Sequence, residues 1–193
     1  MVKPQTIDIE TFAIYTISIK ICVVSTFSVL KVVIVLKEQT CCFTGHRTIP
    51  LGMERKLFCV TEEIVEKAIK DGYQYFGAGG ALGFDTIAAL VVLKLKKHYP
   101  DIKLILVLPC KTQTQGWKNK DVEIYEDIKK RADKVVYTSQ RYVRGCMHKR
   151  NRHLVDNSSL CICYYTKEIG GTHYTVNYAY HKLLKVLNIA ELL

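Results

Sequence analysis

From about residue 38 onward, short apolar runs alternate with longer segments in which apolar side chains recur every three or four positions. A short apolar run bounded by turn residues favours a buried strand, and the longer spacing favours a helix with one buried face. The predicted strands lie at 40–43, 74–78, 103–108, 134–137, 160–165 and 186–190. The predicted helices lie at 53–71, 84–98, 122–132, 147–156 and 172–184. This alternation implies right-handed crossovers, so we predict an α/β fold, a three-layer α/β/α sandwich with a mostly parallel sheet.

Glycine and polar residues follow three of the predicted strands. The junctions contain, in order, Thr44, Gly45, His46 and Arg47; Gly79, Gly80, Gly83 and Asp85; and Gly170, Gly171 and Thr172. The carboxyl ends of parallel strands meet at one edge of a sheet, so the three junctions predict a single ligand pocket. Glycines there let backbone N–H groups come close to an anion, and the N-terminus of the helix that follows favours negative charge.

Each junction also has a plainer explanation when it is taken alone. Residues 77–83 approach a dinucleotide-binding fingerprint, but Gly-x-Gly-x-x-Gly would need glycine at Leu82, and a tight strand-to-helix turn explains them equally well. Residues 170–172 could hold a phosphate or simply cap a helix. Arg47 could pair with a phosphate and His46 could act as an acid or base, or both could be polar loop residues. The sequence has no Gly-Lys-Ser/Thr motif, which argues against a Walker ATPase.

Asp85 and three further residues have both a functional and a structural interpretation. Arg150 and Asn151 stand near the start of a predicted helix rich in cations, where they could reach the same pocket or belong to a solvated basic face. Trp117, in the polar loop 110–120, could stack on a base or anchor the loop on the domain. Asp85 could simply complement the dipole of the helix that it begins. We include all four among the candidate ligand-binding residues.

The chain is basic, with a formal net charge of +10 over 193 residues, a length that suits one α/β domain with a real core. Residues 111–152 contain twelve Lys or Arg against five Asp or Glu, so 12 − 5 = +7 of that charge lies in this one segment. A basic patch suggests a polyanionic ligand such as a nucleotide, RNA or DNA, although a solvated surface would have the same composition.

The cysteines indicate a reducing, cytoplasmic setting rather than a metal site. There are eight, with no Cys-x-x-Cys pair, and most lie in strand-like apolar runs where they read as small core residues. Cys146 and His148 are two residues apart, which on a helix places them on different faces. The sequence therefore predicts neither a metal ligand nor a catalytic residue.

Residues 12–36 are apolar and rich in β-branched side chains, but Lys20 and Lys31 interrupt them. The uncharged run 21–30 is shorter than the roughly 20 residues that cross a bilayer. Three interpretations remain open: an extra element packed on the domain, a membrane anchor, or a peripheral extension. We predict an apolar N-terminal extension at 1–37, for which membrane contact by residues 12–36 is not favoured, and a ligand-binding domain at 38–193.

Taken together, the motifs at 42–47, 79–85, 150–151 and 170–172, followed by Tyr178-Ala179, resemble the YpsA-like family. That family belongs to the SLOG superfamily of Rossmann-like folds, with the DNA-processing protein DprA and the LOG nucleotide hydrolases. The resemblance covers about 38–190. It implies a cytoplasmic Rossmann-like domain that binds or senses a nucleotide or a nucleotide-derived ligand, such as NAD or an ADP-ribose derivative, in cell division or stress signalling of Gram-positive bacteria. By motif, the residues of the three junctions would line the three turns of the pocket.

One departure from the LOG pattern bears on activity. LOG hydrolases read Gly-Gly-x-Gly-Thr followed closely by a glutamate, whereas residues 170–175 have neither the extra glycine nor that glutamate. We therefore predict a binding module that needs no cofactor rather than a nucleotide hydrolase. Two alternatives stay open: a hydrolase or transferase that uses His46 or Asp85 as acid or base, and single-stranded nucleic-acid binding through residues 111–152. A homo-oligomer is also left open.

Overall fold

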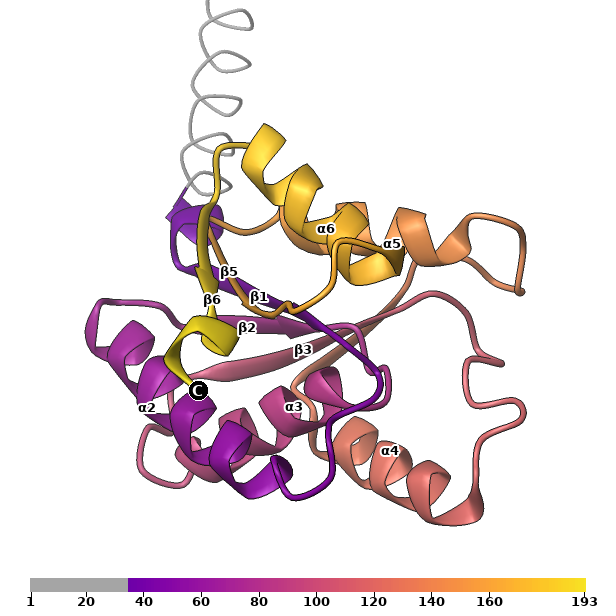
Figure 1. Ribbon diagram of the computed structural model, residues 1–193, viewed down its shortest axis with the longest axis horizontal. Helices are drawn as coiled ribbons and strands as arrows, with labels where there is room; N and C mark the ends of the chain where they lie inside the picture. Colours follow the sequence, from indigo (N-terminus) through magenta and orange to yellow (C-terminus); the bar gives the residue numbers. More distant parts are fainter. Residues whose placement is uncertain (1–34) are drawn as a thin grey trace, which may run out of the picture. The chain divides into compact units, whose positions relative to one another are not determined.

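The computed structural model describes residues 35–193 (Figure 1), and residues 37–193 form one compact unit. The prediction for the N-terminal extension falls almost wholly outside the described residues and stays a prediction. Within residues 35–193, no helix combines the length and the apolar character that crossing a bilayer requires.

The described residues form one sheet of six parallel strands in the order β4-β3-β2-β1-β5-β6. The strands are β1 (Thr40–Gly45), β2 (Tyr75–Ala78), β3 (Lys103–Leu108), β4 (Lys134–Tyr137), β5 (Leu160–Tyr164) and β6 (Lys185–Asn188). The helices are α2 (Glu54–Lys70), α3 (Phe84–Leu95), α4 (Asn119–Arg131), α5 (Cys146–Asp156) and α6 (Gly170–His181). This Rossmann-like α/β arrangement confirms the predicted fold class.

Helices cover both faces of the sheet, as the alternation of buried side chains requires. Phe43 of β1 points into a core closed by α2, α3 and α4, whereas its neighbour Cys42 points into a second core closed by α5 and α6. Figure 1 shows the two groups of helices on opposite sides of the sheet. Helices α5 and α6 pack over β1, β3, β5 and β6, and residues of edge strand β4 and of α5 line a groove together.

Several predicted element boundaries were wrong by two or three residues, among them the start of α4 and the ends of α3 and α6. The last predicted strand, 186–190, stops at Asn188, and a 3-10 helix, η1 (Ile189–Leu192), follows. The Asn188 side chain accepts a hydrogen bond from the Ala190 N–H at 3.2 Å, which turns the chain out of the strand. Helix α6 begins at Gly170 rather than at 172, so both glycines lie in its first turn.

The strand order fixes where a ligand can bind. The chain builds outward from β1 through β2 and β3 to β4, then crosses back to β5 on the other side of β1. The loops after β1 and β5 therefore diverge, and in open α/β sheets ligands bind in the crevice at this topological switch point.

Candidate functional site

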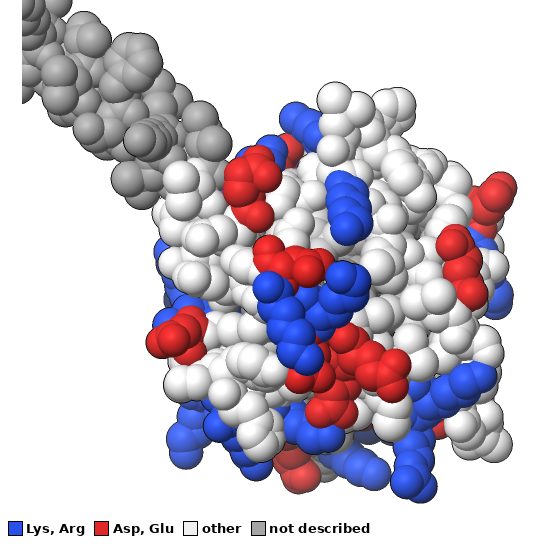
Figure 2. Space-filling view, turned by 90° about the vertical axis from the view of Figure 1, so that its left-hand side faces the viewer, with Lys and Arg blue, Asp and Glu red and all other residues white. Residues whose placement is uncertain are grey.

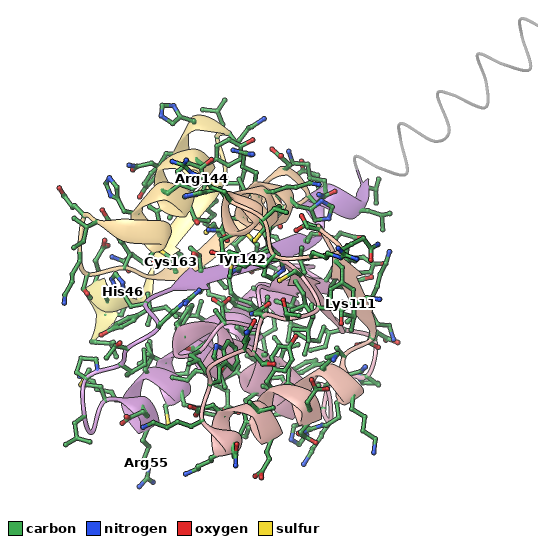
Figure 3. All side chains as sticks on the ribbon, turned by 90° about the vertical axis from the view of Figure 1, so that its right-hand side faces the viewer. His46, Arg55, Lys111, Tyr142, Arg144 and Cys163 are labelled. Atoms are coloured by element: carbon green, nitrogen blue, oxygen red, sulfur yellow. The ribbon has the colours of Figure 1, made fainter. Side chains whose placement is uncertain are left out.

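A pocket of about 280 Å³ opens at the switch point, and we call it the switch pocket. It is lined from four connections, those after β1, β2, β4 and β5. Ten of the fourteen predicted site residues line it: Thr44, Gly45, His46, Arg47, Asp85, Arg150, Asn151, Gly170, Gly171 and Thr172. The structure thus brings the three predicted junctions together, and it adds the start of α5. Figure 3 looks onto the side of the molecule where the loops after β3 and β4 project.

Three of the remaining predicted residues are glycines that contact the chain itself. A β-carbon on Gly79 would lie 1.4 Å from Nη1 of Arg150, so this glycine gives room to a guanidinium. Gly83 has φ +75°, and a β-carbon there would lie 2.4 Å from the Arg47 carbonyl oxygen. Gly80 packs near Leu108. The second junction therefore shapes the pocket from behind rather than touching a ligand with its glycines.

Trp117 does not line the switch pocket. Its ring packs edge-on against Tyr125 of α4, with 5.5 Å between centroids and 80° between planes, and it contacts the first core. This contact anchors the loop between β3 and α4 on the domain. Of the two interpretations of Trp117, the position thus fits the anchor rather than the stacking on a base.

Asp85 and Arg150 form a buried ion pair in the wall of the pocket. Nη1 of Arg150 donates to Oδ2 of Asp85 at 3.4 Å, and the same oxygen accepts the Ala81 N–H at 3.3 Å. The Asp85 side chain is 4% exposed and that of Arg150 8%, so water compensates neither charge well. Neither the solvated-face interpretation of Arg150 nor the dipole interpretation of Asp85 accounts for this pair.

Burial dominates the ionisation of both groups. It raises the pKa of Asp85, against the attraction of Arg150 and a weaker one from Arg47. It also lowers the pKa of Arg150, and the neighbouring Arg47 charge lowers it further, while Asp85 opposes both. The pocket thus holds two guanidinium groups against one carboxylate, an excess of 2 − 1 = +1 that an anionic ligand would neutralise.

The guanidinium of Arg150 is not fully satisfied by its neighbours. Its Nε is buried and finds no hydrogen-bond partner within residues 35–193. An unpaired buried donor costs about 1–3 kcal/mol, so this nitrogen is an unsatisfied polar group in the wall of the pocket.

The third junction stands open toward the pocket. A β-carbon on Gly171 would have no described atom within 4 Å apart from its chain neighbours and the backbone of its own helix, and its φ is not in the left-handed region. Packing therefore gives no reason for glycine at this position. Thr175 Oγ1 donates to the Gly171 carbonyl and accepts from Nδ2 of Asn151, both at 2.7 Å, which ties the start of α6 to α5.

His46 holds the loop that leads into α6. Its Nε2 accepts the Thr166 N–H at 2.9 Å, and its ring stacks on Tyr165 with centroids 6.4 Å apart. Desolvation lowers the pKa of His46, and the charge of Lys167 lowers it further, which favours the neutral imidazole that this hydrogen bond needs. Through this hydrogen bond, His46 positions the loop between β5 and α6.

Sequence reasoning missed four residues of this region. Ala81, Met147 and Ile169 also line the pocket, and each stands next to a predicted junction or helix start. Gln113 clamps the second junction from the loop before α4, since its Nε2 donates to the carbonyl oxygens of Gly79 and Gly80 at 3.2 and 2.7 Å. No local pattern marks Gln113, because its partners lie more than 30 residues away.

The described cysteines are free thiols, of which Cys59 is exposed and the others are buried. Across residues 35–193 no group of three or more His, Cys, Asp or Glu side chains is arranged to hold a metal ion. The chemistry of the pocket is thus carried by its two arginines, its backbone turns and its hydroxyl groups.

The open parallel sheet with a pocket at its switch point defines a Rossmann-like domain. The model of the YspA SLOG family matches residues 41–189, and the chain belongs to this family, which confirms the predicted resemblance. The UPF0398 protein of Bacillus thuringiensis (strain Al Hakam) is 30% identical over 138 residues, which cover 67% of this chain and 75% of that protein. A UPF0398 protein of Bacillus cereus (strain Q1) matches to the same extent.

Two solved structures share the fold at low identity. DNA processing protein A (DprA) from Streptococcus pneumoniae superposes with a TM-score of 0.56 at 16% identity, covering 78% of this chain and 50% of that one. DprA from Helicobacter pylori, whose structure is described for its single-stranded DNA binding mode, gives 0.56 at 17% identity, covering 80% and 66%. This chain therefore spans half the length of the first and about two thirds of the second. Identities this low show a common fold.

Proposed function

We propose that the switch pocket binds a phosphate-bearing nucleotide, or a nucleotide-derived ligand such as an NAD or ADP-ribose derivative, without turning it over. The excess positive charge of Arg47 and Arg150 over Asp85 favours an anion. The pocket volume of about 280 Å³ is close to the lower end of the roughly 300–1,000 Å³ of small-molecule sites. A mononucleotide, or one half of a dinucleotide, suits that space.

One observation carries the proposal: two features of the pocket wall have no explanation within the described chain. The buried Nε of Arg150 has no hydrogen-bond acceptor there. Position 171 is a glycine although a β-carbon would have room. A phosphate at the N-terminus of α6 would explain the open space at Gly171, because it would need the room that a side chain there would take. It would accept from backbone N–H groups and from the guanidinium groups that line the pocket.

The same geometry supports binding over turnover. A general acid or base needs a free proton-transfer atom aimed at the ligand. Nε2 of His46 is occupied by the Thr166 N–H, and Oδ2 of Asp85 accepts from both Ala81 and Arg150. Both candidates of the hydrolase alternative thus use one of their two polar atoms to hold the pocket together, so a proton transfer would have to use Nδ1 of His46 or Oδ1 of Asp85.

Arg47→Ala tests the proposal at little risk to the fold. Arg47 is exposed, and no hydrogen bond or ion pair of its side chain is recorded within residues 35–193. Titration calorimetry of the full chain measures the affinity for AMP, ADP-ribose and NAD. We expect the variant to bind the preferred ligand about tenfold more weakly than the wild type does. A charge-assisted contact is worth about 1.5–3 kcal/mol when it is well ordered, and less when it is exposed.

Arg55→Ala is the matched control, since Arg55 is an exposed arginine of α2 that lies far from His46 (Figure 3). It should leave the affinity unchanged. Equal affinities for the wild type and Arg47→Ala would remove Arg47 from the site.

A second candidate, single-stranded nucleic-acid binding, is favoured by a groove on the other side of α5. Its walls contain the cations Lys149 and Arg152, and His153, beside residues of β4. The only acid in the groove, Asp156, is already engaged by Lys182 at 3.2 Å and by the hydroxyl of Tyr178 at 2.9 Å. By contrast, the side shown in Figure 2, opposite that in Figure 3, carries Lys, Arg, Asp and Glu intermixed.

Salt dependence separates the two candidates. Phosphodiester binding in the groove predicts an affinity for a short oligothymidylate that falls steeply with salt and weakens in Arg152→Ala. A mononucleotide in the switch pocket predicts a shallow salt dependence and no effect of Arg152→Ala. A shallow oligothymidylate curve, unaffected by that substitution, would exclude the groove.

A further inference from the structure

The connection between β4 and α5, residues 138–145, crosses the carboxyl edge of the sheet, and we call it the crossing loop. Strand β4 lies at one margin of the sheet, whereas α5 packs over β1 and β3, and its Arg150 reaches Gly79 at the end of β2. The loop must therefore pass the ends of β3 and β2 to reach the switch pocket. Its last residue, Gly145, caps α5 in the left-handed conformation (φ +84°), and Met147 in the next turn lines the pocket.

Large apolar side chains stand exposed in the crossing loop and just before α6. In the crossing loop, Tyr142 is 66% exposed and Val143 52% exposed. Across the pocket, Ile169 is 73% exposed although it belongs to the pocket lining. Tyr142 and Val143 are not part of the pocket lining, but they precede Met147, which is, by five and four residues. Exposed large apolar groups in a loop that leads into a polar pocket are candidates for contact with an apolar part of a ligand.

Among the aromatic residues near the pocket that are compared here, Tyr142 is the one whose ring packs against no other ring. Trp117 packs against Tyr125, and Tyr164 and Tyr165 pack against His46. For Tyr142, in contrast, neither a ring contact nor a hydrogen bond is recorded within the described part of the chain. Figure 3 places Tyr142 near the middle of the ligand-binding side, between His46 and Lys111.

The crossing loop is lightly held. Its backbone hydrogen bonds lie at its two ends: Thr138 N–H donates to the Leu108 carbonyl at 2.9 Å, and the carbonyls of Val143 and Gly145 accept from the N–H groups of Cys146 and Lys149 at 3.0 and 2.9 Å. Residues 140–145 are all exposed. Few contacts hold this segment, so it can settle onto a ligand at small cost.

We propose that Tyr142 stacks on an aromatic base of the ligand, with Ile169 against the base from the side of α6. This assignment rests on the proposed function and narrows it: the ligand is a nucleotide that is recognised through its base as well as its phosphate, and a sugar phosphate alone binds weakly. Base–aromatic stacking tolerates any base because every base has a π-face, so Tyr142 contributes affinity rather than a choice among bases.

The test compares ligands with and without a base on the full chain. Titration calorimetry measures AMP, ADP-ribose and NAD against ribose 5-phosphate, for the wild type, Tyr142→Ala and Tyr142→Phe. We expect the tightest base-containing ligand to bind at least tenfold better than ribose 5-phosphate. Tyr142→Ala should remove most of that advantage and leave ribose 5-phosphate unchanged, and Tyr142→Phe, which keeps the ring, should retain it.

The outcomes separate this inference from the function on which it rests. If ribose 5-phosphate binds as tightly as the nucleotides, or if Tyr142→Ala leaves nucleotide affinity unchanged, the stacking role is overturned and the phosphate pocket stands. If none of the four compounds binds the folded protein, the proposed function fails, and the role of Tyr142 fails with it.

Discussion

Replacing Arg150 with methionine is expected to destabilise the protein by about 3–5 kcal/mol, the usual cost of leaving a buried charge without its partner. Asp85 would then lie at 4% exposure with the Ala81 N–H as its remaining recorded donor. Methionine keeps most of the volume of the arginine side chain, so the loss would come from the charge rather than from a cavity. Urea unfolding of the full chain, followed by circular dichroism, measures it.

The loss should depend on pH in a defined direction. Burial raises the pKa of Asp85 above that of the unfolded chain, and removing Arg150 removes the main opposing influence. The folded variant then binds a proton that the unfolded chain releases from about pH 4 upward. Its stability should therefore be highest in mild acid and fall as the pH rises, more steeply than that of the wild type.

Asp85→Asn in the Arg150→Met background provides the control. It removes the buried charge, so it should recover much of the lost stability at neutral pH and abolish the additional pH dependence. An Arg150→Met protein as stable as the wild type at neutral pH would contradict the pair, as would a double variant no more stable than the single one.

Gly171→Ala is expected to weaken ligand binding by about 100-fold, equivalent to about 2.7 kcal/mol, while the protein stays as stable as the wild type or gains up to about 1 kcal/mol. Gly171 lies in the first turn of α6 with φ outside the left-handed region, where alanine is the better helix former. Its missing β-carbon faces no neighbour of the described chain, so a methyl group there would meet only the ligand.

Gly79→Ala is the matched comparison, with the opposite outcome. A β-carbon there would collide with Nη1 of Arg150 and lie 2.7 Å from Oδ2 of Asp85, so the buried pair must shift and the protein should lose stability. Denaturant unfolding together with calorimetry on both variants separates the two roles of glycine. If Gly171→Ala binds the ligand as the wild type does, no phosphate lies against the start of α6.

The fold could be predicted because burial leaves a local trace in the sequence. Apolar runs such as 103–108 and the helical spacing of 53–71 gave the strands, the helices and their alternation, and alternation restricts the topology to a parallel sheet. Strand ends were less predictable, as Asn188 shows, since a single side-chain hydrogen bond ends β6.

The pocket could be located from the sequence, but the function of its parts could not. Position after a strand is a local property, which is why residues 44–47 and 170–172 were found. The Asp85–Arg150 pair joins residues 65 positions apart and depends on how α3 and α5 pack, which no spacing encodes. The prediction for Trp117 considered the polarity of its loop, whereas the packing partner Tyr125 lies in the following helix.

The glycines show the same limit most clearly. All of them were expected to bring backbone N–H groups to an anion, yet Gly79 and Gly83 make room for Arg150 and for the turn after β1, while Gly171 is open. The sequence shows where a glycine stands. Only the structure shows which neighbouring atoms a β-carbon at that position would meet.

The measurement that most directly tests the central claim is the thermal unfolding of the full chain with AMP, ADP-ribose, NAD and adenosine, each at the same concentration. A ligand that binds only the folded state at 100 times its dissociation constant stabilises it by about 2.7 kcal/mol, and this raises the midpoint by about 5–10 °C for a protein of this size. The account predicts that at least one phosphate-bearing ligand gives such a shift and that adenosine gives a much smaller one. Equal shifts with AMP and adenosine, or no shift with any phosphate-bearing ligand, would contradict a phosphate site in the switch pocket.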